Sequence, residues 1–426
     1  MQPLHFSFLF VGFLLTSLLI RLWLASRQIR HVAQHSHQVP AAFEGRISLP
    51  AHQRAASYTI ARVRLGMLDL WLGAAVLLVI TLMGGLQLID EFWMRWLPTH
   101  PVLQQLATVA STLLIISVAE LPLDWWRHFR LETRFGFNRM TPGLFVADHL
   151  KGLLLGAVLG LPLLAGLIAM MRYTGAAWWI WAWTFWTGFS LLMLLIFPAF
   201  IAPLFNRFDP LPDGPLKDRI LALLERCQFS AQGLFVMDGS RRSAHGNAYF
   251  TGFGKARRIV FFDTLLARLE PQEVEAVLAH ELGHFRKKHI LRRMWLQAAL
   301  SLACFALLGW LSGQVWFYQG LGIAISPLQS QAPAGVALLL FFLALPVFAL
   351  PLRPLMAWLS RRDEFEADAF AAGHADGRAL VSALTKIYED NAATLTPDPL
   401  HSAFHDSHPP AIQRIGRIEQ LLHSAS

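Results

Sequence analysis

Long apolar stretches alternate with short polar segments along most of the chain. Seven of these stretches are long enough, at about 20 residues each, to cross the hydrocarbon core of a bilayer as helices. They lie near residues 5–25, 66–89, 102–123, 152–171, 177–204, 294–317 and 334–358. The first is expected to be a retained span, because the N-terminal segment has neither a basic region nor a small-residue cleavage site. The pattern predicts an all-α integral membrane protein with about seven transmembrane helices.

Two longer polar segments interrupt this pattern. In the first, "GLFVMDGS" and "RRIVFFD" have strand character, and "HGNAYFTGFGK" is typical of a third strand that enters a glycine-containing turn. A helix then begins at Pro271, with acidic residues in its first turn and basic residues at its end. The second segment is predicted to be mostly helical up to "TPDPLHSAFHDSHPP".

These elements divide the chain into four predicted parts. An N-terminal membrane region of five spans is followed by a small α/β insert, a hairpin of spans six and seven, and a C-terminal polar segment. Their boundaries are 1–204, 205–293, 294–358 and 359–426.

The distribution of charged residues predicts the orientation of the chain in the membrane. Only 15% of the residues are charged, against about 25% in soluble domains, and the mean hydropathy is +0.44. The excess of basic residues, a formal net charge of +8, clusters in loops beside the apolar stretches, where it sets membrane topology; no nucleic-acid partner is expected. The positive-inside rule places the N-terminus outside and both polar segments in the cytoplasm. Three acids in or beside the spans are expected to face a polar interior: Asp69, Glu120 and Asp124.

The insert contains the motif "HELGH". His280 and His284 are four residues apart on the predicted helix, so both imidazoles project from one face, as two ligands of one metal ion require. Glu281 is then placed to take a proton from the attacking water. The pattern indicates metal-assisted hydrolysis, with a chance match as the alternative. The two cysteines of the chain exclude a cysteine-based zinc cluster and a disulfide framework.

A catalytic zinc site needs a third protein ligand. The next candidate is "SRRDEFEADAFA", where Glu364 and Asp368 share one helix face. Spacing alone does not decide which of four acids is the ligand, since Asp363 and Glu366 are candidates as well. It also leaves open whether the segment is simply an acidic surface helix. The histidine pair precedes span six and the acids follow span seven. A hairpin of these spans would bring both to the cytoplasmic edge of the membrane.

Several blocks of the sequence resemble those of the type I CAAX prenyl endopeptidases, integral-membrane zinc metalloproteases of the gluzincin group. The blocks occur in the family's order and span most of the chain: "SYTIARVRLG", "LETRFGFNRMTPGLFVAD", "SAHGNAYFTGFGKARRIVFFDTLL", "VLAHELGHFRKKH", "SRRDEFEADAFA" and "DSHPPAIQRI". The resemblance implies a barrel of seven transmembrane helices around a large chamber, with one zinc ion at its cytoplasmic end.

The resemblance also implies roles for individual residues. His280, His284 and Glu364 would bind Zn²⁺, Glu281 would act as the general base, and Asp368 would support a ligating histidine.

Four more residues follow from the same match. Asn247, Ala248 and Tyr249 resemble the edge strand that pairs with the substrate backbone, although an ordinary hairpin is the alternative. His408 resembles a histidine that steadies the developing oxyanion, with a simple loop residue as the alternative. The remaining nearby histidines are expected to be solvated: His289, His401 and His405.

The expected function is therefore a zinc metalloendopeptidase that cleaves near the C-terminus of membrane-associated proteins or peptides, prenylated C-a-a-X proteins being the family's best-known substrates. A quality-control protease without prenyl specificity is the alternative within that class, and a non-catalytic metal-binding scaffold or transporter is the alternative outside it. The expected partners are this substrate and membrane lipid. The composition favours a bacterial inner membrane, or the ER membrane if the source is eukaryotic.

Overall fold

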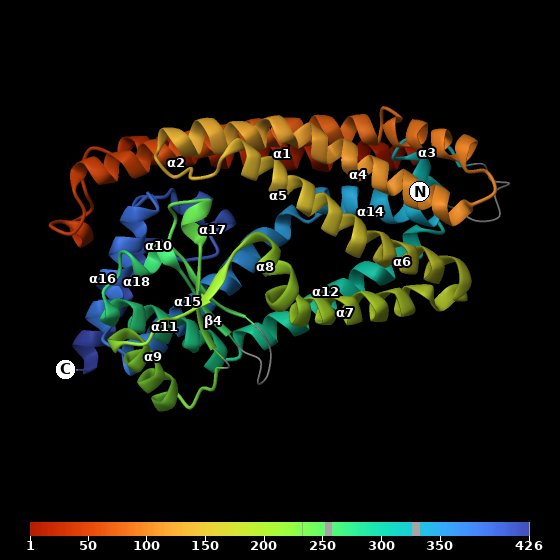
Figure 1. The fold of residues 1–426 in the computed structure, drawn as a ribbon. Coiled ribbons are helices and arrows are strands. Elements are labelled where there is room, and N and C mark those ends of the chain that lie inside the picture. Colours follow the sequence, from red (N-terminus) through yellow and green to blue (C-terminus); the bar gives the residue numbers. More distant parts are fainter. Residues whose placement is uncertain (232, 252–257, 326–332, 426) are drawn as a thin grey trace.

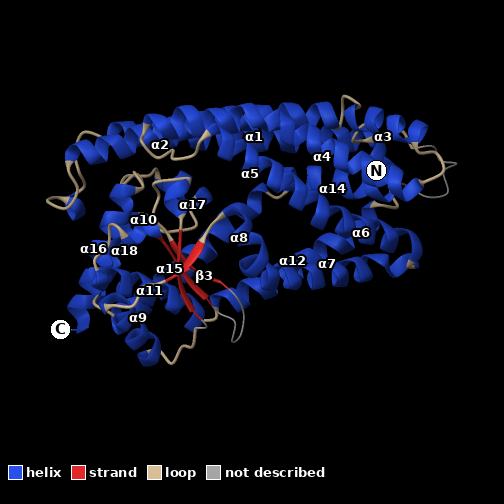
Figure 2. Cartoon of the chain, viewed as in Figure 1, coloured by secondary structure: helices blue, strands red, loops and turns tan. Residues whose placement is uncertain are grey.

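The fold is seen in a computed structural model that describes residues 1–231, 233–251, 258–325 and 333–425. Helices dominate it, and four short strands form one sheet (Figures 1 and 2). The helices are α1 Pro3–Gln34, α2 Leu49–Ile80, α3 Gly85–Trp96, α4 Pro101–Trp126, α5 Pro142–Leu155, α6 Leu161–Tyr173, α7 Trp178–Ile196, α8 Ala202–Phe205, α9 Pro215–Arg226, α10 Asp263–Leu266, α11 Pro271–Arg286, α12 His289–Leu311, α13 Val315–Gln319, α14 Ala334–Phe348, α15 Arg353–His374, α16 Gly377–Asp390, α17 Pro399–His405 and α18 Ala411–Ala425. The strands are β1 Phe208–Pro210, β2 Gly233–Met237, β3 Ala248–Thr251 and β4 Arg258–Phe262.

The membrane region confirms the predicted number of spans. Within the described residues, six helical segments are long and apolar enough to cross a bilayer, and a bent pair makes a seventh. The six segments are Pro3–Gln34, Leu49–Ile80, Pro101–Glu132, Pro142–Tyr173, Gly175–Phe205 and His289–Leu311.

Two predicted spans have the wrong limits. The second, expected over 66–89, ends at Ile80, because the chain turns through Gly84 at φ +83° before α3 begins. The seventh, expected over 334–358, is bent by 54° between α14 and the segment Leu350–His374. Pro351 explains this break, since proline has no backbone N–H and its ring clashes with the preceding helical turn.

The spans are packed too loosely for a solid bundle. In the six continuous spans, between 6% and 33% of the apolar stretch is buried against other parts of the chain, whereas α14 of the seventh span is mostly buried. Figure 1 shows α1, α2 and α4 running together along one side and α7 and α12 along the other. A hydrophobic core around α14 joins the two sides at the end remote from the sheet. This arrangement fits the helical barrel that the resemblance implies, and cavities of about 1130 and 460 Å³ are lined by residues of its helices.

The insert and the C-terminal segment fold together at the other end of the molecule. The strand order is β1-β2-β4-β3, with β2 and β4 parallel and both outer pairs antiparallel. Three strands and the start of α11 confirm the sequence prediction, whereas β1 was not predicted. The turn expected after β3, at 252–257, lies outside the described residues. Apolar residues of β4, α9, α11, α16 and α18 form a separate core that fixes the position of α11.

Two of the three acids in the spans have charged partners. Arg127 bridges Asp69 and Asp124, and Asp69 lies on cavity walls, as expected for an intramembrane acid. Glu120 is exposed on α4.

Candidate active site and metal centre

Helix α11 presents the histidine pair. A reciprocal capping box between Glu270 and Glu273 fixes its first turn. At Gly283, a Cβ atom would lie 2.9 Å from the Cα of Ala367, so glycine allows α11 and α15 to approach at this point. This close approach brings the acids of α15 against the histidines of α11.

Three donor groups converge between these two helices. The Nε2 atoms of His280 and His284 are 3.2 Å apart, and they lie 3.4 and 3.3 Å from the carboxylate oxygens of Glu364. A tetrahedral ion with bonds of about 2.0–2.1 Å places its ligands about 3.3 Å apart, so these spacings fit one such ion. The Oε2 atom of Glu364 is buried without a hydrogen-bond partner in the described residues, as a metal ligand would be. The donor set and its spacing therefore fit a metal ion.

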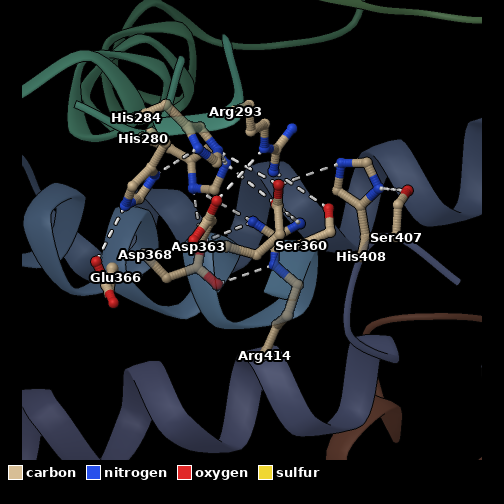
Figure 3. A network of polar contacts seen from close by, with 12 residues as sticks. His280, His284, Arg293, Ser360, Asp363, Glu366, Asp368, Ser407, His408 and Arg414 are labelled. Atoms are coloured by element: carbon tan, nitrogen blue, oxygen red, sulfur yellow. Dashed lines mark hydrogen bonds and ion pairs between the residues drawn. The ribbon is translucent and has the colours of Figure 1, made fainter. Parts of the chain in front are cut away.

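Asp368 and Arg414 hold the first of these histidines. The Nδ1 atom of His280 lies 2.8 Å from Asp368, and the guanidinium of Arg414 donates two hydrogen bonds to the same carboxylate, at 2.6 and 2.9 Å (Figure 3). Burial alone would lower the pKa of His280, but the nearby carboxylates of Asp368 and Glu364 raise it to about 9. Metal binding to Nε2 would therefore release a proton.

The second histidine has a longer support. The Nδ1 atom of His284 lies 3.0 Å from Nδ1 of His289, whose Nε2 lies 3.0 Å from Oε2 of Glu366. If Nε2 of His284 binds a metal, its Nδ1–H donates to His289, and the proton of His289 is on Nε2 and is donated to Glu366. The expectation that His289 is solvated was wrong, since it is 1% exposed. Its place at the start of α12, just after the turn from α11, directs it inward.

The segment of α15 is not an acidic surface helix. Asp363, Glu364 and Asp368 are each at most 4% exposed. Asp363 forms ion pairs with Arg292 and Arg293 of α12, so it anchors α15 rather than joining the donor group. Among the acids left open by spacing, Glu364 is the one that faces both histidines.

A cavity of about 1130 Å³, here called the central cavity, connects this group to the membrane helices. Glu281 and His408 line its wall, and so do Asp69 of α2 and Arg127. Burial raises the pKa of the Glu281 carboxyl, which favours proton acceptance near neutral pH. The His408 Nε2 atom lies 3.5 Å from Oε1 of Glu364, and Figure 3 shows its ring pointing at the cluster from the side opposite His284.

Strand β3 is at the edge of the sheet, next to the same cavity. Asn247 and Ala248 line the central cavity, whereas the Tyr249 side chain lies at a separate small cavity and contacts Met237. The structure thus brings Asn247 and Ala248 to the site and turns the Tyr249 side chain away from it. Strand β3 is the last in the strand order, so its outer edge pairs with no other strand of this sheet in the described residues.

Two further histidines lie outside this group. His405 is exposed, as predicted. His401 is half-buried with its Nδ1 atom inaccessible, so its prediction as a solvated residue was wrong.

Comparison with known proteins decides the family. A family model described as the CAAX prenyl protease N-terminal region, five membrane helices, matches residues 28–207. The model of peptidase family M48 matches residues 210–422. The chain belongs to the CAAX prenyl proteases of peptidase family M48. This confirms the resemblance and the predicted class, an integral multi-pass membrane metalloendopeptidase.

Relatives match this M48 peptidase over most of its length. The CAAX prenyl protease 1 homolog of Caenorhabditis elegans is 31% identical over 97% of the chain and 98% of its own length. The homolog of Arabidopsis thaliana is 35% identical over 76% of the chain and 75% of its own length. A crystal structure of S. mikatae Ste24p superimposes with a TM-score of 0.90 and 29% identity, covering 97% of this chain and 99% of that one.

Three site residues were missed by the sequence analysis. Arg414 and Gly283 both lie inside blocks that carry the resemblance, but neither is a metal-ligand or general-base residue of a recognised motif. His289 follows His284 by five residues, a spacing that does not place both rings on one continuous helix face. The tight turn between α11 and α12, with Lys288 at φ +58°, nevertheless brings the His289 ring against that of His284.

Proposed function

We propose that this M48 peptidase is a zinc endopeptidase that cleaves peptide bonds near the C-terminus of membrane-associated proteins. His280, His284 and Glu364 are the zinc ligands, because two imidazoles and one carboxylate are a common catalytic zinc set. The observation that carries the proposal is the mutual spacing of these donors, 3.2–3.4 Å, beside a cavity that reaches the membrane helices.

The residues of the site divide the chemistry between them. A zinc ion held by His280, His284 and Glu364 would supply Lewis-acid polarisation of the scissile carbonyl and of the attacking water. Glu281 takes the proton of that water and passes it to the leaving amine. His408 donates a hydrogen bond to the oxyanion as it develops. Asp368 fixes the ring orientation of His280 throughout.

Peptide binding uses the edge of the sheet. An extended substrate adds to β3 as a further strand, and the Asn247 side chain hydrogen-bonds its backbone. The backbone of Tyr249, rather than its side chain, contributes to this pairing. Main-chain hydrogen bonds of this kind bind peptides of many different sequences, as a protease that accepts varied C-terminal residues requires.

The substrate class is a lipid-modified C-a-a-X protein. Relatives of this chain are named CAAX prenyl protease 1, and the central cavity joins the metal donors to α2, a membrane span. A substrate held in the bilayer by its prenyl group can therefore reach the site. The basic residues of the loops support a cytoplasmic location for this end, with the bacterial inner membrane as the favoured location and the ER membrane for a eukaryotic source.

Cleavage of a farnesylated C-a-a-X peptide by the detergent-purified protein tests this proposal, with an unprenylated twin as the comparison. Cleavage of the farnesylated peptide near its C-terminus, lost in Glu281→Gln, is the expected result. Equal cleavage of both peptides would retain the protease and remove the prenyl specificity. Intact peptides with both proteins would refute the proposed substrate class.

A further inference from the structure

A second cavity contains basic residues that lack acidic partners. It has a volume of about 460 Å³ and lies between α1, α2, α14 and the start of α15. Arg21, Arg353, His401 and His405 line it, and its carboxylate, Asp69, is already paired with Arg127. We call it the α1–α2–α14 cavity.

The two arginines of this cavity are unpaired. In the part of the chain that the structure describes, neither Arg21 nor Arg353 forms an ion pair with a carboxylate. The Nε atom of Arg21 and the Nδ1 atom of His401 are inaccessible to solvent and have no hydrogen-bond partner in those residues. Such a site favours an anion that accepts several hydrogen bonds.

The walls of the cavity are apolar. Leu14 and Leu18 come from α1, Leu77 from α2, and Leu343 and Val347 from α14. All three helices belong to the membrane-spanning segments. The ligand therefore has an anionic head and an apolar body, because only an amphiphile matches both ends of the cavity.

The depth of Arg21 matches the headgroup level of a bilayer. It lies 18 residues after Pro3 in α1, which is about 27 Å along the helix axis, against about 30 Å for a hydrocarbon core. The ion pair between Arg27 and Asp398, two turns further on, attaches this end of α1 to the segment before α17. Arg21 thus lies near the polar surface of the leaflet that faces the catalytic domain.

The C-terminal carboxylate of the substrate does not reach this cavity. Arg353 precedes Glu364 by eleven residues of α15, or about 16 Å along the axis. Both residues lie on nearly the same helix face, and the Arg353 side chain leans toward the helix N-terminus, away from the metal donors. Three residues beyond a scissile bond span at most about 11 Å. The carboxylate of a C-a-a-X product therefore stays too close to the metal donors.

We infer that the α1–α2–α14 cavity binds an anionic phospholipid, with the phosphate on Arg21 and Arg353 and an acyl chain against the apolar walls. The site lies beside the central cavity, with which it shares Gly66 and Asp69 on α2. A lipid bound there would link the two helices of the N-terminal hairpin to the bent seventh span. The inference rests on the proposed C-a-a-X substrate only where it excludes the substrate carboxylate from this cavity.

Native mass spectrometry of the delipidated, full-length protein in detergent tests this inference. Phosphatidylglycerol is titrated against phosphatidylcholine with identical acyl chains. We expect tighter binding of phosphatidylglycerol and a loss of about fivefold for each of Arg21→Gln and Arg353→Gln, since one arginine near a membrane surface contributes about that factor. Arg30→Gln is the matched control, because Arg30 is an exposed arginine of the same helix outside the cavity.

Three results would overturn the inference. These are equal binding of the two lipids, a double variant that binds phosphatidylglycerol as Arg30→Gln does, and displacement of the lipid by millimolar inorganic phosphate or by a free C-a-a-X tetrapeptide. The melting temperatures of the lipid-free variants show whether they are folded. Arg353 is exposed, so Arg353→Gln alone remains a valid test if Arg21→Gln does not fold.

Discussion

Replacement of His289 tests whether a residue outside the metal donors sets the affinity for zinc. His289 accepts the hydrogen bond that orients His284 and passes the interaction on to Glu366, through two contacts of 3.0 Å. His289→Ala leaves the Nδ1–H of His284 in a largely buried position without its acceptor. No other change to the donor group is expected.

The magnitude follows from that lost contact. A buried polar group without a partner costs about 1–3 kcal/mol, and loss of an outer hydrogen bond to a metal-binding histidine weakens metal binding about 10–100-fold. The two ranges agree, because 100-fold corresponds to about 2.7 kcal/mol. We expect zinc affinity to fall about 10–100-fold in His289→Ala, nearer the lower value if water fills the space.

Competition with a chromogenic chelator of known zinc affinity measures this change in the detergent-purified protein. His289→Gln should recover part of the affinity, because its amide can accept from His284 and donate to Glu366. His374→Ala is the matched control, since His374 is exposed and its Nδ1 lies 2.9 Å from the carbonyl of Phe370 in its own helix. Wild-type zinc affinity in His289→Ala would refute the reasoning.

Three other changes probe the frame of the site. Gly283→Ala places a methyl group 2.9 Å from the backbone of α15, so zinc content and peptidase activity should fall together, and a fully loaded, active variant would contradict this packing argument. Arg414→Met removes the arginine partner of the buried Asp368 carboxylate and leaves only its contact with His280. Breaking a buried pair in this way costs up to about 3–5 kcal/mol, so the melting temperature should drop sharply, unlike that of the exposed control Arg417→Met. Burial would raise the pKa of Glu273, but hydrogen bonds from Lys386 and Ser382 lower this pKa below 4.5. The ionised Glu273 carboxylate therefore stabilises the fold fully above pH 4.5, and this stabilisation is lost as the pH falls through the lowered pKa. The melting-temperature difference between wild type and Glu273→Gln should therefore shrink below pH 4.5, and a constant difference would exclude this role.

Much of the membrane region could be predicted, because a bilayer demands about 20 apolar residues for each crossing helix. The limits of the spans could not be read in the same way. Helix α2 begins at Leu49, well before its apolar stretch, since hydropathy does not detect the polar turns that extend a helix beyond the membrane. The bend between α14 and α15 depends on a proline whose effect competes with a continuous apolar run.

The donor set could also be predicted in part. The spacing of His280 and His284 reports directly on one helix face, whereas Glu364 is more than 70 residues away and was singled out by resemblance. The supporting contacts of Arg414 and His289 depend on how α18 and α12 pack against the donor helices. Such tertiary contacts leave no local period in the sequence, so spacing could not identify them.

The central claim is that Glu364 holds the metal and Glu281 performs chemistry on it. Zinc content by elemental mass spectrometry, measured with peptide cleavage on the same preparations, separates the two roles. We expect about one zinc per chain in wild type and in Glu281→Gln, with cleavage in wild type alone, and loss of both zinc and cleavage in Glu364→Ala. A Glu364→Ala protein that keeps its zinc, or a Glu281→Gln protein that cleaves at the wild-type rate, would contradict the account.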